Sequence, residues 1–192
     1  MIFVSINPFA LKRFFLFLFA ALGFSCLSCF GQSVLLGVKN TPYDRQMTRI
    51  RPFLIANQER PEGNVSLRLV NFWIGNLRSI PYGFTREWKT PEETESGAPA
   101  DCKAKAVDLY ERMRSHGATN LRLVIGRHTS TSRCTHAWVE WDTEEGSYVL
   151  DPTLAWRAFP VRALGRRSYI PLFAYEGEKK YRAGRADLVA QN

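Results

Sequence analysis

The stretch ADCKAKAVDLYERMRSHG, residues 100–117, decides how the rest of this 192-residue chain is interpreted. Asp101 is a good helix N-cap, and apolar residues recur along one side of the segment that follows it. Gly117 suits the left-handed conformation that commonly ends a helix, and Arg114 and His116 in the last turn complement the negative end of the helix dipole. The pattern predicts a helix that begins near Asp101 and ends at Gly117.

Cys102 therefore lies in the first turn of this helix. The positive end of the dipole and the free backbone N–H groups there favour a thiolate over a thiol. A thiolate is the nucleophile that acyl transfer needs, and the same N–H groups can face a developing oxyanion. Lys103 and Lys105 add positive charge near the sulfur. Taken by itself, however, a cysteine on a helix is more often a small buried apolar side chain.

Strand-like segments follow the helix. Residues 121–125, 135–141 and 147–150 are rich in β-branched and aromatic residues, and a turn is expected between the last two. One more strand is expected near residues 168–174, in a basic, turn-rich tail. A helix followed by an antiparallel meander predicts an α+β fold.

The residues before the helix have weaker patterns. Residues 32–62 contain three prolines and are expected to form an irregular leader with one short helix around residues 45–55. Residues 64–78 have apolar side chains at a spacing closer to 3.6 than to 2, which predicts a helix. Residues 79–100 contain proline and glycine at short intervals and are predicted to form a loop.

The N-terminus has the pattern of an export signal. Lys12 and Arg13 precede the apolar run at residues 14–22, and no acidic residue occurs before Asp44. Residues 1–31 are therefore predicted to be a signal peptide or an uncleaved membrane anchor. Residues 32–192 are then one exported domain, periplasmic or secreted, and membrane-associated if the N-terminal segment is retained.

Composition and charge bound what this domain can be. Hydrophobic residues make up 45% and aromatic residues 13% of the chain, which is enough to build a core. The formal net charge of +8 favours acidic partners such as anionic membrane surfaces or cell-wall polymers. The basic residues are scattered and no nucleic-acid motif accompanies them, so nucleic acid is not an expected partner. Cys26 and Cys29 also leave a lipoprotein open as an alternative at the N-terminus.

His136 and Asp151 complete a candidate triad with Cys102. His136 lies in one predicted strand, and Asp151 directly follows the next. A lone histidine in a strand is usually structural, and an aspartate before a proline is usually part of a turn. A nucleophile at a helix start, a base on one strand and a carboxylate at the end of the next would meet at one helix–sheet junction. There His136 would take the thiol proton and later protonate the leaving amine, while Asp151 orients the imidazole.

Five short motifs carry a resemblance to a known family. They are VNFWIGN (70–76), EWKTPEET (87–94), ADC (100–102), HAWVE (136–140) and LDPT (150–153). In this joint order, the motifs resemble those of the bacterial transglutaminase-like cysteine peptidases. The resemblance spans about residues 64–156, which we expect to form the core of the domain.

The resemblance implies a papain-like, transglutaminase-like core with Cys102, His136 and Asp151 as its triad. It implies hydrolysis or transfer of a peptide amide through a thioester, with a peptide or protein substrate in the cell envelope and no cofactor. In transglutaminases an upstream tryptophan donates its indole N–H to the oxyanion, so Trp88 and Trp73 are oxyanion candidates, although core packing is the commoner role.

The chain departs from the family directly after the nucleophile. Family members that release surface adhesins bind calcium through acidic residues just after the cysteine. Lys103 and Lys105 stand at those positions here, and no carboxylate appears until Asp108. We therefore predict no calcium site of that kind, and adhesin processing does not follow from the resemblance.

Two other uses of the same residues stay open. A disulfide between Cys102 and Cys134 would block the nucleophile and leave a catalytically inactive binding domain. Because Cys134 is two residues before His136 and would share its face of a strand, a redox-gated enzyme is a variant of this idea. A metal site from these residues and His128 matches no paired-ligand zinc spacing, so we predict no metal. His116 and His128 are expected to face solvent.

Overall fold

The computed structural model describes residues 34–55, 65–165 and 167–184. The predicted export signal at residues 1–31 lies outside them. Within the described ranges, no helix is both long enough and apolar enough to cross a membrane.

An antiparallel sheet organises the domain. Within the described residues its strands are β1 (Val34–Gly37), β2 (Leu121–Thr129), β3 (His136–Thr143), β4 (Gly146–Leu150), β5 (Phe159–Pro160), β6 (Ser168–Glu176) and β7 (Lys179–Gly184). Their order in space is β1-β7-β6-β2-β3-β4-β5. Strands β2, β3 and β4 form the expected meander, and the short β5 pairs with β4. Strand β6 crosses back to pair with the other edge of β2. The predicted α+β class is confirmed.

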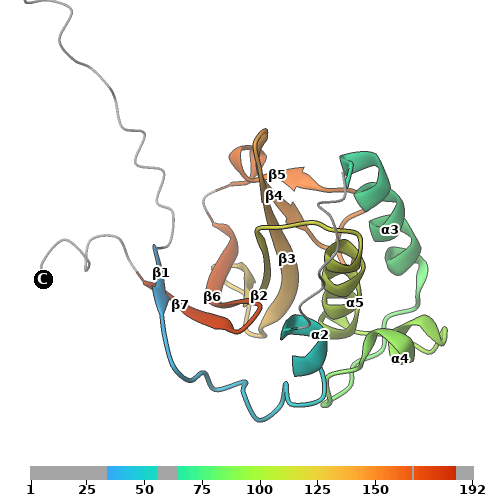
Figure 1. The fold of residues 1–192 in the computed structure, drawn as a ribbon, viewed down its shortest axis with the longest axis horizontal. Helices are drawn as coiled ribbons and strands as arrows, with labels where there is room; N and C mark the ends of the chain where they lie inside the picture. The colour runs from blue at the N-terminus through green and yellow to red at the C-terminus, as the bar shows by residue number, and fades with distance from the viewer. Residues whose placement is uncertain (1–33, 56–64, 166, 185–192) are drawn as a thin grey trace, which may run out of the picture. The chain divides into compact units, whose positions relative to one another are not determined.

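Helices cover one face of this sheet. They are α2 (Arg51–Ile55), α3 (Leu67–Ser79), α4 (Pro91–Glu95) and α5 (Cys102–Ser115), with a 3₁₀ turn η1 at Val161–Ala163. Helix α5 packs against β2 and β3, and α2, α3 and α4 each contact α5 (Figure 1). Fully buried side chains such as Leu109 and Met113 of α5 and Leu123 and Val139 of the sheet form the core between these layers.

Local signals placed the two long helices. Asp101 caps α5 by accepting a hydrogen bond from the Ala104 N–H at 3.2 Å. At the other end, Gly117 adopts the positive φ of 89° expected after a helix. Helix α3 begins after Ser66, whose side chain accepts from the Leu69 N–H at 3.3 Å. Both predicted helices are confirmed, within a few residues at their ends.

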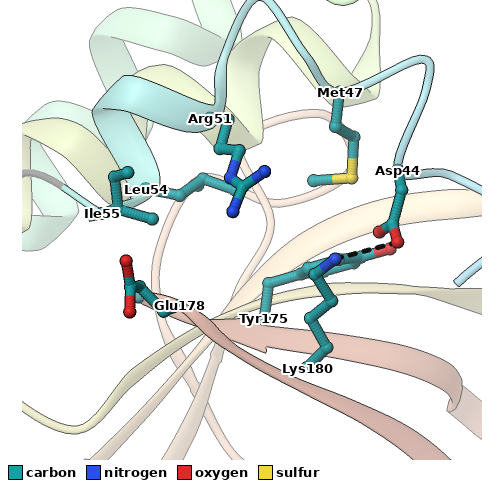
Figure 2. A pocket seen from close by; sticks show the side chains of 9 residues that line it. Asp44, Met47, Arg51, Leu54, Ile55, Tyr175, Glu178 and Lys180 are labelled. Atoms are coloured by element: carbon teal, nitrogen blue, oxygen red, sulfur yellow. Dashed lines mark hydrogen bonds and ion pairs between the residues drawn. The ribbon is translucent and has the colours of Figure 1, made fainter. Parts of the chain in front are cut away.

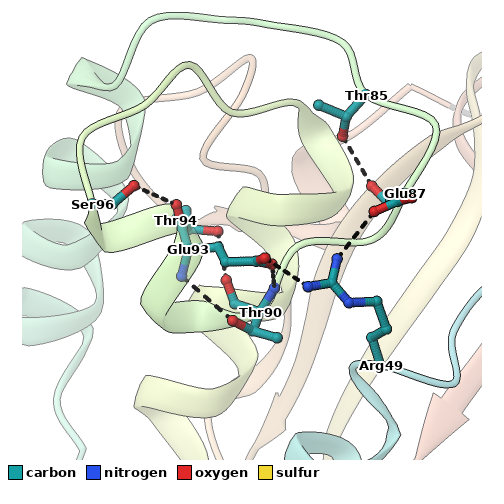
Figure 3. Close-up of polar contacts among 7 residues, drawn as sticks. All are labelled: Arg49, Thr85, Glu87, Thr90, Glu93, Thr94 and Ser96. Atoms are coloured by element: carbon teal, nitrogen blue, oxygen red, sulfur yellow. Dashed lines mark hydrogen bonds and ion pairs between the residues drawn. The ribbon is translucent and has the colours of Figure 1, made fainter.

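The predicted loop at residues 79–100 is wrong in its middle, where α4 forms. Thr90 and Glu93 make a capping box: the Thr90 hydroxyl accepts from the Glu93 N–H at 3.4 Å, and the Glu93 carboxylate accepts from the Thr90 N–H at 2.8 Å. Arg49 then bridges Glu93 and Glu87, as Figure 3 shows. Proline at the first helical position favours such a start, although a simple count of prolines indicates a loop.

The two ends of the domain also differ from the sequence expectation. The helix expected at residues 45–55 is confined to α2, and turns occupy residues 42–50. Strands β1, β5 and β7 were not predicted. Strands β1 and β5 are only four and two residues long, and the charged segment KKYRAG of β7 lacks the pattern of a buried strand. A small cavity of about 40 Å³ lies between α2 and the β6–β7 hairpin, close to the ion pair of Asp44 and Lys180 at 2.8 Å (Figure 2). Its lining does not include Cys102, His136 or Asp151.

Candidate active site

Cys102 is the first residue of α5, half-buried and not in a disulfide. In the first turn of a helix the backbone N–H groups have no carbonyl four residues earlier to bond. Asp101 uses one of them, that of Ala104, which leaves the N–H groups of Cys102 and Lys103 at the helix start. The sulfur therefore lies where backbone donors and the positive end of the dipole are concentrated.

His136 and Asp151 are brought together by the β3–β4 hairpin. The His136 Nε2 lies 2.7 Å from Asp151 Oδ2. The Asp151 carboxylate is fully buried and also accepts from the N–H groups of Thr153 at 2.9 Å and Leu154 at 3.1 Å and from the Tyr169 hydroxyl at 2.9 Å. With each oxygen accepting two hydrogen bonds, the carboxylate has a single orientation, and so does the imidazole bonded to it.

The electrostatics of the pair favour a charged imidazole. Burial by itself would lower the pKa of His136, but hydrogen bonds to Asp151 and Cys102, together with the negative charges of these groups, raise it to about 9. Burial likewise acts to raise the pKa of Asp151, and the hydrogen bond from His136 outweighs it and holds that pKa below its usual range. Since Nε2 is engaged by Asp151, Nδ1 is the nitrogen left to face the sulfur. The arrangement suits a thiolate–imidazolium pair with a carboxylate behind it.

This raised pKa predicts how stability depends on pH. The folded protein holds the His136 proton more tightly than the unfolded chain, so the stabilisation is complete below about pH 6.5 and is lost as pH rises to about 9. We expect up to about 3 kcal/mol of the free energy of unfolding to disappear across this window. Urea unfolding of the wild type and His136→Gln at both ends of the window measures it. A difference between the two proteins that stays constant with pH would contradict the prediction.

The aromatic rings of Trp138 and Tyr169 pack next to the imidazole of His136. The Trp138 ring lies 6.1 Å from the His136 ring at an interplanar angle of 25°. The Tyr169 ring meets Trp138 edge-on at 5.3 Å. Gly126 on the neighbouring strand makes room for the indole, because a Cβ there would lie 2.5 Å from Trp138 Cη2 and 2.2 Å from the Ile170 carbonyl oxygen. The position of the imidazole thus depends on a glycine of β2.

Tyr169 is a partner of Asp151 that the sequence did not reveal. It adopts a positive φ of 50°, a conformation that costs a bulky residue about 1–3 kcal/mol. Burial and the charge of Asp151 raise its pKa, so it stays protonated and donates to that carboxylate. The one available signal was a predicted strand near residues 168–174. Its pairing with β2 rather than β5, which brings Tyr169 to Asp151, has no local signature.

The two predicted oxyanion tryptophans have different positions. Trp73 packs 4.8 Å from the ring of His116, the C-cap of α5. Because a 14-residue helix is about 21 Å long, Trp73 is at the opposite end of α5 from Cys102. Trp88 is almost fully buried, and its indole N–H finds no hydrogen-bond partner within the described part of the chain.

The other cysteine of the described residues and the two remaining histidines differ in how exposed they are. Cys134 is exposed and, like Cys102, free. His116 is exposed, as expected, whereas the expectation that His128 faces solvent is wrong in part. His128 is half-buried with its ring 6.1 Å from that of His136, because β2 runs beyond its predicted end and pairs there with β6. The described residues contain no group of three or more His, Cys, Asp or Glu side chains arranged to hold a metal ion.

The chain shares its fold with LapG of Legionella pneumophila. Calcium-bound LapG aligns with a TM-score of 0.52 at 16% identity, covering 77% of this chain and 83% of LapG. EGTA-treated LapG aligns with a TM-score of 0.53 at 15% identity, covering 79% of this chain and 87% of LapG.

The likeness to LapG is one of structure rather than of sequence. No protein-family model matches the chain, and a search of curated proteins finds no match either. At this level of identity LapG establishes the fold, and the chemistry must be argued from the residues of this chain.

Proposed function

We propose that the chain is a transglutaminase-like cysteine peptidase or amidase of the kind that LapG represents. It cleaves or transfers a peptide amide bond through a thioester on Cys102. The observation that supports this most directly is the buried hydrogen bond between His136 and Asp151 at 2.7 Å, with Cys102 at the start of α5 close enough to contribute to the raised pKa of His136.

The proposed reaction has two halves. The Cys102 thiolate attacks the amide carbonyl carbon, and the oxyanion that forms accepts hydrogen bonds from N–H groups at the start of α5. The His136 imidazolium then gives its proton to the nitrogen as the C–N bond breaks, which releases an amine and leaves a thioester. In the second half the neutral imidazole takes a proton from water or an amine, which attacks the thioester and frees the thiolate. Asp151 keeps Nε2 protonated throughout.

Exposed apolar side chains near the triad support a peptide substrate. Tyr82 and Phe84 are 59% and 72% exposed on the segment that leads to Cys102, and Trp156 is 63% exposed five residues after Asp151. The pKa of Tyr82 is raised by burial and, to a smaller extent, by negative charge at Cys102, Asp101 and Cys134, so Tyr82 lies within electrostatic reach of the start of α5. Large exposed aromatic groups are typical of surfaces that bind peptides.

The proposed enzyme acts outside the cytoplasm. The N-terminal sequence pattern supports export, and a peptide or protein of the cell envelope as the substrate. Membrane association through residues 1–31 would follow if that segment is retained. We expect neither a cofactor nor nucleic acid to take part. The alternative, an inactive binding domain closed by a Cys102–Cys134 disulfide, gains no support from two free thiols.

Thiol labelling tests the proposal without knowledge of the substrate. The reduced, folded protein is treated with a limiting amount of iodoacetamide at about pH 6, where an ordinary thiol is mostly protonated. We expect Cys102 to react at least about tenfold faster than the exposed Cys134, as read by peptide mass mapping. His136→Ala should remove this preference. Equal labelling of both cysteines in the wild type would argue for a domain without an activated nucleophile.

A further inference from the structure

Two lysines occupy the start of α5, where positive charge is least expected. Lys103 and Lys105 closely follow Cys102, and the first turn contains no acidic residue. The N-terminus of a helix is its positive end, so cations there oppose the dipole. Neither side chain extends freely into solvent: that of Lys103 is 17% exposed, and Lys105 is 1% exposed. Both must be held by specific partners.

Lys103 joins the helix cap to the preceding segment. Its ammonium group donates to the Asp101 carboxylate and to the Thr85 carbonyl, the latter at 2.8 Å, and lies 5.1 Å from the centre of the Phe84 ring. The same Asp101 oxygen accepts from the Thr85 N–H at 3.2 Å. The carboxylate that caps α5 is therefore shared between the helix, the lysine and residues 84–85.

Lys105 makes a second connection two residues further along the helix. Its Nζ donates to the Ile80 carbonyl at 2.6 Å. Burial and the charge of Arg78 lower its pKa, while the negative charge of Asp151 acts in the opposite direction, so the ammonium lies within electrostatic reach of the triad carboxylate. An N–H donated by Ala100 to the Pro81 carbonyl at 2.9 Å fixes the same stretch of backbone.

We propose that Lys103 and Lys105 are positioning residues that bind residues 80–85 to the start of α5, and that Lys103 also offsets the negative charge of Asp101 next to the nucleophile. This rests on the function proposed above. Residues 80–85 carry Tyr82 and Phe84, so the two ammonium groups also hold one aromatic wall of the substrate site beside the sulfur.

Alkylation of Cys102 as a function of pH tests the charge. With iodoacetamide and peptide mass mapping, Lys103→Met should slow labelling of Cys102 about tenfold near pH 6, and the difference should shrink toward about pH 9. Lys103→Arg retains the charge and should stay within about threefold of the wild type. Lys179→Met removes one positive charge from the exposed β6–β7 hairpin and should leave the profile unchanged. A merely structural lysine would not shift the rate in this pH-dependent way.

Limited proteolysis tests the connection to residues 80–85. Chymotrypsin cleaves after aromatic residues, and Lys105→Met should speed its cleavage after Tyr82 and Phe84 about tenfold by allowing local opening. If Lys105→Met does not fold, as judged by circular dichroism, the Lys103 variants decide alone. A wild type whose Cys102 reacts no faster than Cys134 overturns the proposed function itself. A reactive wild type that Lys103→Met matches at every pH, with unchanged cleavage in Lys105→Met, overturns only the role of the lysines.

Discussion

Cys102→Ala is expected to abolish peptide cleavage, with a loss of at least about 10⁴-fold in turnover. No other group can replace the sulfur, because Cys134 is exposed and no contact with His136 is found for it within the described part of the chain. The residual rate should reflect binding and backbone donors alone. Cleavage is measured by mass spectrometry on a mixture of peptides, so that an unknown substrate preference does not hide the effect.

Cys134→Ser is the matched control for this loss. It removes the other free thiol of the described residues while leaving the helix start untouched. Its turnover should stay within about twofold of the wild type, since Cys134 is exposed and single surface substitutions usually have small effects. Strong activity in Cys102→Ala, or a comparable loss in Cys134→Ser, would mean that the nucleophile has been assigned to the wrong residue.

Asp151→Asn is expected to lower turnover by about 10²- to 10⁴-fold, despite the almost identical size of the side chains. All four hydrogen bonds at this carboxylate come from donors: His136, Tyr169 and the N–H groups of Thr153 and Leu154. An amide has one oxygen, so its NH₂ group must point at two of these donors. If it points at the imidazole, His136 has to carry its proton on Nδ1, which then cannot accept the thiol proton.

The pH profile distinguishes this explanation from simple unfolding. Without the Asp151 charge the pKa of His136 should fall from about 9, so the alkaline limit of activity should move to lower pH. Circular dichroism should show a folded variant, and Asp151→Glu should recover little, because the longer side chain displaces the carboxylate from its fixed donors. An Asp151→Asn enzyme with the rate and pH profile of the wild type would contradict a triad role for Asp151.

Features encoded locally could be predicted from the sequence. The start of α5 depends on Asp101 and its end on Gly117, and each acts within a few residues of its own position. His136 and Asp151 belong to consecutive strands joined by a short turn, so a hairpin alone brings them together. This is why the approach of His136 to Asp151 could be expected from the order of the elements alone.

Features set by long-range pairing could not be predicted. Tyr169 reaches Asp151 because β6 crosses back to β2, and such a crossover leaves no periodic pattern in the sequence. Trp73 was an oxyanion candidate by its order in the chain, yet α3 turns it toward the far end of α5. Lys103 and Lys105 indicated only positive charge near the sulfur, since their carbonyl partners lie 18 and 25 residues away.

Gly126 occupies a position of the site where no side chain fits. The atoms of Ile170, Pro171 and Trp138 surround this position so closely that even a methyl group would lie within 3 Å of each. Every one-base change of a glycine codon that alters the residue adds at least that methyl group. A residue that has no side chain and takes part in no chemical step is therefore one at which the site tolerates no ordinary substitution without a shift of its neighbours.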